Sequence, residues 1–264
     1  MAVRNLCAAA AAMALLPAHA AINVSSPAFS YAQNFDTLAA SGTPNWFNDS
    51  TLAGWSLFTA AGTTVPSYAT GDGSSNTGSF YSFGTVGSSD RALGGTGSGG
   101  SYFGSPLSGA VAGYIAVAFT NGTGNALSGF SLAFDGEQWR NGGNTSAQSM
   151  VLQYGFGASF AAVGSWAQPG GRFDWASPVT GSTAAAVDGN AAGKVASRGG
   201  IVNTAWASGD TLWVRWIETN DVGNDHGLAI DNLSLSVSAV PEPATWALML
   251  CGGAALVARL RRAG

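Results

Sequence analysis

The sequence predicts an all-β protein, an antiparallel β-sandwich of jelly-roll type, over most of its 264 residues. Apolar residues recur at every second position in many short segments, as expected of strands with one buried face. Clusters of Gly, Asn, Asp and Ser separate these segments. Between the two ends of the chain, no amphipathic helical pattern of a dozen residues occurs. Many short strands joined by turns favour a sandwich.

Apolar alternation predicts five strands in chain order, over residues 114–119, 130–135, 150–156, 212–217 and 228–238. The fourth is apolar at every position except Arg215, which indicates a central strand covered on both faces. Four clusters between such segments are typical of turns: residues 71–76, 121–124, 141–144 and 188–190. The run 95–99 matches half of a nucleotide-binding fingerprint, but no helix pattern follows it, so we interpret it as a loop.

The last predicted strand changes phase in its middle. Its apolar residues occupy even positions up to Ile230 and odd positions from Leu233 onward. A β-bulge at Asp231 and Asn232 would shift the alternation by one residue in this way.

Residues 1–20 have the pattern of a signal peptide. Arg4 precedes an apolar run that ends at Leu16, and small residues then form an A-x-A cleavage site, Ala18-His19-Ala20. The exported chain is therefore expected to begin at Ala21. A buried N-terminal helix is the alternative, and the A-x-A sequence disfavours it.

Residues 240–264 combine a proline-rich break, an apolar run and a basic end. The apolar run, 244–258, would span roughly 22 Å as a helix, against the ~30 Å of a bilayer's hydrocarbon core. Such a marginal transmembrane helix suits a tail that is inserted and later removed. By the positive-inside rule, the basic end stays cytoplasmic and residues 21–239 lie on the exported side. The flanking residues are Val240, Pro241, Glu242, Pro243, Arg259, Arg261 and Arg262.

These three parts, in this order at the end of the chain, resemble the PEP-CTERM sorting signal of Gram-negative bacterial surface proteins. The resemblance implies an exosortase-type sorting enzyme as partner and a precursor anchored in the membrane by the helix. It implies a final location at the cell surface or in the extracellular matrix. It assigns no activity to residues 21–239, the expected ectodomain.

Segments within 29–238 also resemble the bodies of a recurrent group of exported bacterial proteins. The residues that carry this resemblance are 81–84, 91–94, 136–140, 213–216 and 227–232. The resemblance implies a β-sandwich exposed at the surface and supplies no catalytic residue.

Composition excludes several functions for the exported segment. Both cysteines, Cys7 and Cys251, lie in the targeting segments, so thiol catalysis and thiolate metal sites are excluded. Thirteen acidic and six basic residues remain, a net charge near −7. Because no basic cluster could neutralise several phosphates, nucleic acid is not an expected partner.

Two arginines stand beside tryptophans, Arg140 after Trp139 and Arg215 between Trp213 and Trp216. A buried arginine needs a partner, so one hypothesis pairs these arginines with carboxylates and fixes the register of the sheets. The available carboxylates are Asp135, Glu137, Glu218 and Asp231. The other hypothesis is a carbohydrate-binding surface, in which these tryptophans stack on a sugar ring and Arg140 binds its hydroxyl groups.

The polar stretch 220–231 could bind calcium, the one cofactor that the sequence suggests. Asp221, Asp225 and Asp231 supply carboxylate oxygens at close spacing, the ligands that Ca²⁺ prefers. No Glu stands at the twelfth position of an EF-hand loop. The alternative is a hairpin turn stabilised by Asx hydrogen bonds.

Catalytic patterns are weak in the exported segment. His226 is its single histidine and no G-x-S-x-G motif occurs. Glu137 and Glu218 could in principle form the carboxylate pair of a glycosidase. The sequence therefore predicts a non-enzymatic surface or matrix protein. The alternatives are a carbohydrate-binding module that adheres to extracellular polysaccharide and, less favoured, a cryptic hydrolase.

Overall fold

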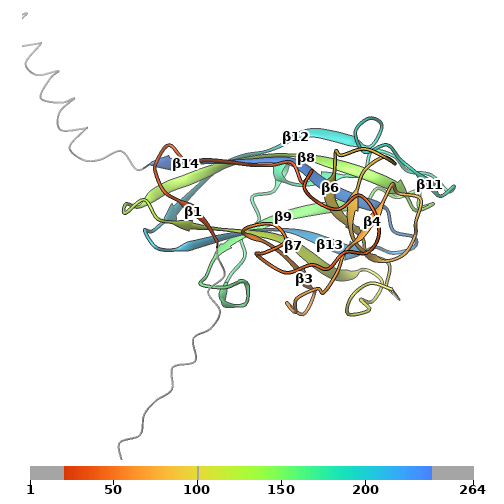
Figure 1. The fold of residues 1–264 in the computed structure, drawn as a ribbon, viewed down its shortest axis with the longest axis horizontal. Helices are drawn as coiled ribbons and strands as arrows, with labels where there is room; N and C mark the ends of the chain where they lie inside the picture. Colours follow the sequence, from red (N-terminus) through yellow and green to blue (C-terminus); the bar gives the residue numbers. More distant parts are fainter. Residues whose placement is uncertain (1–20, 100, 240–264) are drawn as a thin grey trace, which may run out of the picture.

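The computed structural model describes residues 21–99 and 101–239, which form a two-layer β-sandwich (Figure 1). One layer is a six-stranded sheet in the order β1-β7-β13-β9-β10, with β3 also paired to β7. The other is an eight-stranded sheet in the order β11-β8-β14-β6-β5-β4, with β12 also paired to β8 and β2 to β14. The predicted signal peptide, 1–20, and the sorting signal, 240–264, lie outside the described residues.

The strands have the following bounds. The six-stranded sheet contains β1 (Ile22–Val24), β3 (Trp55–Thr59), β7 (Ala110–Asn121), β9 (Ser149–Phe156), β10 (Trp175–Ala176) and β13 (Thr211–Asn220). The eight-stranded sheet contains β2 (Ser30–Gln33), β4 (Ala69–Gly71), β5 (Ser79–Phe83), β6 (Ala92–Thr96), β8 (Leu127–Asn141), β11 (Ala185–Ala186), β12 (Lys194–Trp206) and β14 (Gly227–Ala239). Two short 3-10 turns, η1 (Phe160–Ala162) and η2 (Gly171–Phe173), are the helical elements of the described chain.

The all-β prediction is confirmed, and each of the five predicted strands lies within an observed one. Most pairs are antiparallel, as predicted. Two short edge pairs, β1 with β7 and β4 with β5, are parallel.

The predicted β-bulge in the last strand is also confirmed. The pairing of β14 with β8 shifts register between Asp231 and Ser234, and Asn232 has φ 52°, in the left-handed region. Asparagine tolerates that conformation better than most residues. The bulge keeps both halves of β14 apolar toward the interior of the sandwich.

The glycine-rich run 95–99 is not entirely a loop, because its first two residues belong to β6. This strand carries small residues because its neighbour in the sheet is very close. A Cβ atom on Gly94 would lie 2.1 Å from the carbonyl oxygen of Leu228. The close approach of the β6 and β14 backbones, rather than backbone flexibility, therefore accounts for glycine at position 94.

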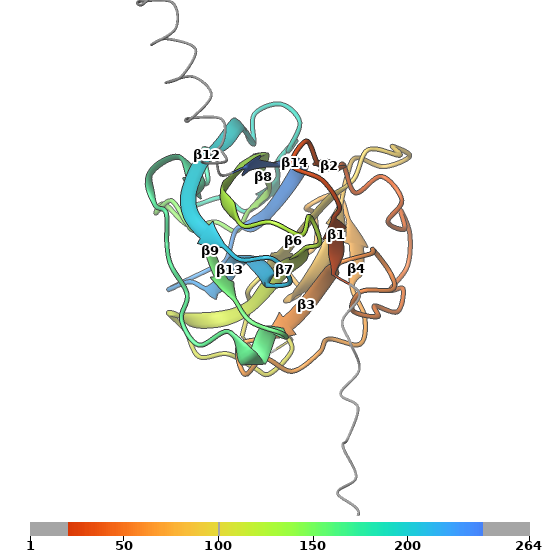
Figure 2. The same cartoon turned by 90° about the vertical axis from the view of Figure 1, so that its left-hand side faces the viewer.

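The main core lies between the two sheets, which face each other in the end-on view of Figure 2. Trp55 of β3 and Trp216 of β13 stack with ring centroids 6.0 Å apart. Phe134 of β8, on the opposite sheet, meets Trp216 edge-on at 5.4 Å. Burying each such side chain contributes roughly 1.5–3 kcal/mol.

Each sheet also carries a smaller apolar cluster on its outer face. On the six-stranded sheet, Phe58, Phe160 and Trp213 pack together. On the eight-stranded sheet, Phe83 and Trp139 stack with centroids 6.2 Å apart. The prediction that residues 212–217 form a central strand covered on both faces is confirmed. β13 lies between β7 and β9, with Trp216 in the main core and Trp213 in the outer cluster.

Candidate functional site

The tryptophans predicted to stack on a sugar are buried. Trp139 and Trp213 are 1% exposed and Trp216 is fully buried. Trp216 lies in the core between the sheets, and the other two lie in the outer-face clusters. Their rings are therefore covered by protein, which contradicts the predicted tryptophan surface. Arg140, predicted to accompany them, is 8% exposed.

Arg215 lies on the outer face of the six-stranded sheet and contacts two other aromatic rings. Its guanidinium carbon is 3.8 Å from the ring centroid of Trp166 and 4.2 Å from that of Tyr114. Its Nε donates a 2.9 Å hydrogen bond to Oε1 of Gln153. Partial burial lowers the pKa of Arg215 from its ordinary value.

The predicted pairing of Arg140 and Arg215 with carboxylates is wrong. Within the described residues, the one ion pair joins Nζ of Lys194 to Oδ2 of Asp135, at 2.9 Å. Arg215 instead uses an amide oxygen and two ring faces, and cation–π contacts of this kind contribute roughly 0.5–2 kcal/mol each.

Trp166 and Tyr114 are both partly exposed, so this part of the sheet presents aromatic surface to solvent. Tyr114 belongs to β7 and Trp166 to the connection between β9 and β10. Phe160 of η1 supports Trp166 from one side, with centroids 5.2 Å apart. We call Tyr114, Gln153, Trp166 and Arg215 the aromatic surface. The sequence patterns did not identify Trp166 as a site residue. Its neighbours include Gly, Ser, Gln and Pro, which are typical of a connection, and a tryptophan there is not buried by strand alternation.

Arg140 lies at the end of the sandwich, where β8 meets the connection between β4 and β5. Its Nη1 donates to the carbonyl oxygens of Gly73 and Ser74, at 3.0 and 2.9 Å. Its Nε is buried and has no hydrogen-bond partner. Arg140 lines a polar pocket of about 200 Å³, which we call the end pocket. The other lining residues are Asn76, Ser98, Gly142, Ala184, Gly223, Asn224 and Asp225.

Asp225 is the buried carboxylate of the end pocket. Its Oδ1 accepts a 2.6 Å hydrogen bond from the backbone N–H of Asp221, and its Oδ2 accepts one of 3.2 Å from the hydroxyl of Ser98. Burial raises the pKa of Asp225 to about 6.

The three aspartates predicted to bind calcium do not converge. Asp221 and Asp225 share the turn after β13, but Asp231 lies inside β14 beside Glu137 and Asp135 of β8. Within residues 21–99 and 101–239, no group of three or more His, Cys, Asp and Glu side chains is arranged to hold a metal ion. Asp225 instead accepts a hydrogen bond from the backbone N–H of Asp221, so its carboxylate closes the turn after β13.

His226 is a buried structural residue. Its Nδ1 lies 3.2 Å from the N–H of Gly142 and 3.1 Å from Nε2 of Gln138, and its Nε2 lies 3.2 Å from the carbonyl oxygen of Ser146. These partners fit a neutral ring that carries its proton on Nε2, and they engage both nitrogens.

Two buried carboxylates lie on the outer face of the eight-stranded sheet. Oε2 of Glu137 accepts a 3.0 Å hydrogen bond from the indole N–H of Trp139. Oε1 of Glu137 and Oδ1 of Asp231 are buried without a hydrogen-bond partner. Burial raises the pKa of Glu137 to about 7 and that of Asp231 to about 8, and the charge of Glu137 adds to the shift of Asp231.

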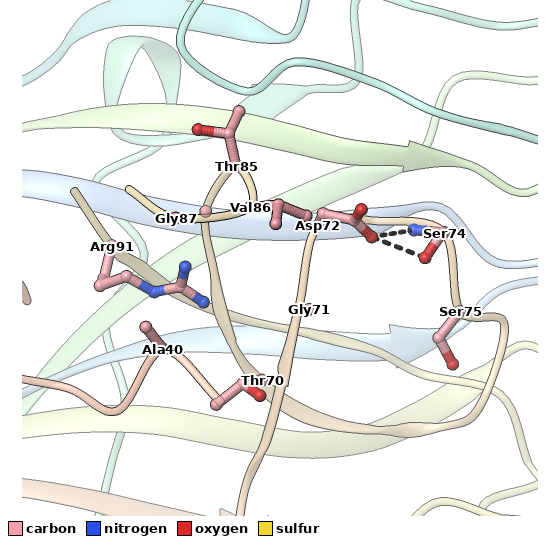
Figure 3. A pocket seen from close by; sticks show the side chains of 11 residues that line it. Ala40, Thr70, Gly71, Asp72, Ser74, Ser75, Thr85, Val86, Gly87 and Arg91 are labelled. Atoms are coloured by element: carbon pink, nitrogen blue, oxygen red, sulfur yellow. Dashed lines mark hydrogen bonds between the residues drawn. The ribbon is translucent and has the colours of Figure 1, made fainter. Parts of the chain in front are cut away.

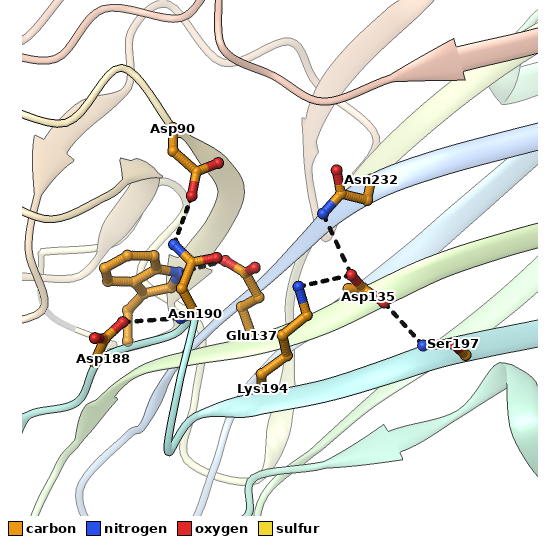
Figure 4. A network of polar contacts seen from close by, with 9 residues as sticks. Asp90, Asp135, Glu137, Asp188, Asn190, Lys194, Ser197 and Asn232 are labelled. Atoms are coloured by element: carbon orange, nitrogen blue, oxygen red, sulfur yellow. Dashed lines mark hydrogen bonds and ion pairs between the residues drawn. The ribbon is translucent and has the colours of Figure 1, made fainter.

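A polar network borders these carboxylates (Figure 4). Lys194 pairs with Asp135, which also accepts a 2.8 Å hydrogen bond from the N–H of Ser197. Farther along, Asn190 donates to Asp90 at 2.7 Å. The network therefore satisfies the surface carboxylates and leaves one oxygen of each buried carboxylate unpaired.

Glu137 and Glu218 cannot act as a glycosidase pair in this arrangement. Glu137 lies on the outer face of the eight-stranded sheet, on the same side as Trp139. Glu218 of β13 lies on the inner side of the opposite sheet, in alternation with Trp216. Burial raises the pKa of Glu218 well above its ordinary value. Such a pair must face one sugar bond from two sides, at about 5–9.5 Å.

A second arginine pocket, of about 290 Å³, opens beside β4 and β5 (Figure 3). Arg91 lies at one end of it, and the hydrogen-bonded pair Asp72 and Ser74 lies at the other. Nε of Arg91 donates to the hydroxyl of Ser82 at 2.9 Å, and its Nη2 donates to the carbonyl oxygen of the same residue. Burial lowers the pKa of Arg91. These hydrogen bonds hold Arg91 against β5, so its role is structural.

The described chain contains no helix that is long and apolar enough to cross a membrane. No known protein-family model matches the sequence, and no characterised protein sequence matches it.

The fold is similar to that of two solved carbohydrate-binding modules. The first is the CBM22-1 xylan-binding domain from Paenibacillus barcinonensis Xyn10C, with 7% identity and a TM-score of 0.36, covering 83% of this chain and 100% of that domain. The second is the family 11 carbohydrate-binding module from Clostridium thermocellum, in complex with a β-1,3-1,4-mixed-linked tetrasaccharide. It has 11% identity and a TM-score of 0.29, covering 77% of this chain and 100% of the module.

Proposed function

We propose that this chain is an exported, non-catalytic surface protein whose β-sandwich binds extracellular polysaccharide. The observation that carries the proposal is the aromatic surface: Tyr114 and Trp166 are partly exposed on one face of a sheet, with Arg215 and Gln153 between them.

A sugar ring has an apolar face and a rim of hydroxyl groups, and the aromatic surface offers a partner for each. Trp and Tyr supply large apolar area, while the guanidinium and the amide supply hydrogen-bond donors. Arg215 is already held by two rings and by Gln153, so little side-chain entropy would be lost when a ligand binds.

The sorting tail is the second part of the proposal. The Pro-Glu-Pro motif, the apolar run 244–258 and the terminal arginines support processing by an exosortase-type enzyme. Mass spectrometry of protein released from the cell surface should then find a C-terminus near Val240 to Pro243. Intact Arg262 on all of the mature protein would contradict processing.

A binding experiment tests the carbohydrate proposal directly. The purified protein is screened against immobilised polysaccharides, alongside Trp166→Ala and Phe47→Ala. Phe47 is a matched control because it is 63% exposed and lies outside the aromatic surface. We expect Trp166→Ala to weaken binding about tenfold or more, as the loss of one stacking side chain does, and Phe47→Ala to bind as the parent does. Equal binding by all three proteins would reject the aromatic surface as the site.

A further inference from the structure

We propose that the end pocket around Arg140 binds a uronic acid residue, so that the polysaccharide recognised is an acidic one. This inference rests on the proposed function and names its class of ligand. It concerns a different part of the molecule from the aromatic surface.

Arg140 is a buried cation without a counter-ion. Its Nη1 is used by two backbone carbonyl groups, its Nε has no hydrogen-bond partner, and within the described residues no carboxylate oxygen lies within the 4.0 Å of an ion pair. An uncompensated buried charge costs several kcal/mol. A ligand carboxylate beside Arg140 would reduce that cost, because hydrogen bonds between a guanidinium and a carboxylate are charge-assisted.

The rest of the lining suits the hydroxyl groups of a sugar. The amides of Asn76 and Asn224 each provide donors and an acceptor. Asp225 is held in place by Ser98 and Asp221, so its carboxylate is a fixed acceptor for a sugar hydroxyl. The pocket thus places a cation and several hydroxyl-binding groups around one small space.

The size of the pocket limits the ligand to about one sugar ring. Its volume, about 200 Å³, is below the roughly 300–1,000 Å³ of pockets that enclose drug-sized ligands. The net charge near −7 of the exported segment does not prevent binding of an anion, because charges farther than about 8 Å are largely screened at physiological ionic strength. Within the pocket the carboxylate of Asp225 opposes an anion, and the proposal requires the contact with Arg140 to outweigh it.

Calorimetric titration of the purified protein tests the inference with glucuronate, galacturonate, glucose, galactose, inorganic phosphate and sulfate. We expect at least one uronate to bind about tenfold or more tightly than its neutral counterpart, and the two inorganic anions to bind more weakly than the uronate. Equal affinity for neutral sugars would overturn the inference. Equal affinity for sulfate or phosphate would overturn it as well, because the pocket would then select charge and not a sugar.

Three variants locate the binding. Arg140→Gln should abolish uronate binding. Asn224→Asp places a negative charge at an exposed lining position, so it should weaken uronate binding about tenfold while the fold is retained. Arg172→Gln is the matched control, an exposed arginine outside the pocket whose loss should leave the affinity unchanged. If Arg140→Gln does not fold, the result with Asn224→Asp decides, and unchanged uronate affinity in that variant would reject the pocket.

The proposals for the aromatic surface and for the end pocket can be rejected independently of each other. Loss of polymer binding in Trp166→Ala with no uronate binding at all would keep the proposed function and reject the end pocket. Uronate binding that Asn224→Asp weakens, together with normal polymer binding by Trp166→Ala, would keep the pocket and reject the aromatic surface.

Discussion

The outer faces of the two sheets differ in the kind of charge that they bury without an ion pair. On the six-stranded sheet, Arg215 has no carboxylate partner and is stabilised by two aromatic rings and an amide. On the eight-stranded sheet, Glu137 and Asp231 are buried without a cationic partner, and Lys194 pairs with Asp135 instead. The cation and the anions that could have neutralised one another lie on opposite sides of the core.

Each kind of charge is accommodated in its own way when no ion pair forms. A guanidinium keeps its charge over any accessible pH, so it needs ring faces and acceptors. A carboxyl group can take up a proton, and the raised pKa values of Glu137 and Asp231 indicate that these groups do so near neutral pH. The stabilisation of Arg215 is therefore independent of pH, whereas that of Glu137 and Asp231 depends on it.

The largest expected effect comes from the tryptophans that anchor the two outer-face clusters. Trp139→Ala and Trp213→Ala should each cost about 3–5 kcal/mol, the usual loss for a buried tryptophan. For a domain of this size, the thermal midpoint should fall by roughly 6–20 °C. Calorimetric melting measures it, with Phe47→Ala as the exposed control. A loss below about 1 kcal/mol in either variant would show that the outer clusters add little to the free energy of unfolding.

Stability should fall as pH rises, because of the carboxylates on the eight-stranded sheet. Glu137 and Asp231 have folded-state pKa values of about 7 and about 8, above the ordinary 4.5 and 3.8. The folded state therefore holds more protons than the unfolded state between about pH 4 and pH 8, and its free energy of unfolding decreases over that window. The decrease is on the order of a few kcal/mol.

Neutral substitutions isolate this contribution. Asp225 and Glu218 also have raised pKa values, so the parent curve includes them. The double variant Glu137→Gln, Asp231→Asn should be more stable than the parent at pH 8 and should gain nothing at pH 4. Denaturant melts at the two pH values measure the difference. Parallel curves for the parent and the variant would show that the two groups ionise normally.

Local patterns in the sequence predicted a large part of the fold. Alternation is a property of each strand, so residues 212–217 and the change of phase at Asp231 correctly predicted a central strand and a bulge. The strand β6 was harder to predict. Gly94 follows from the close approach of β14 and Gly95 from that of Glu218, and glycines leave no apolar pattern of their own.

Charge pairing could not be predicted in the same way. Whether Arg215 meets Glu137 depends on which sheet each strand joins and which face each residue takes, and strands far apart in the sequence decide both. Trp166 lies in the connection between β9 and β10, where no alternation indicates whether a ring is buried or exposed. The end pocket combines residues from β8, the turn before β14 and four other connections, which no local pattern unites.

A smaller effect should follow from changing the arginine on the six-stranded sheet. Arg215→Ala removes contacts with Tyr114 and Trp166 and should cost about 1–2 kcal/mol, or a few degrees in the thermal midpoint. The cost should be the same at pH 5 and pH 8, since no titrating partner is involved. Arg215→Lys, which keeps the charge without the planar group, should recover only part of the loss. Full recovery by lysine would show that charge alone matters here.

The smallest expected effect is that of the ion pair Lys194–Asp135. Its side chains are 29% and 16% exposed, and pairs near the surface contribute roughly 0.2–1 kcal/mol. A double-mutant cycle with Lys194→Met and Asp135→Asn measures this coupling. Lys194 also favours the charged forms of Glu137 and Asp231, because its pKa is raised by all three carboxylates. The single variant Lys194→Met should therefore cost more at pH 9, where all of them are ionised, than at pH 5. A cost that does not change with pH would mean that Lys194 acts on Asp135 alone, and that the buried carboxylates are stabilised only by their protons.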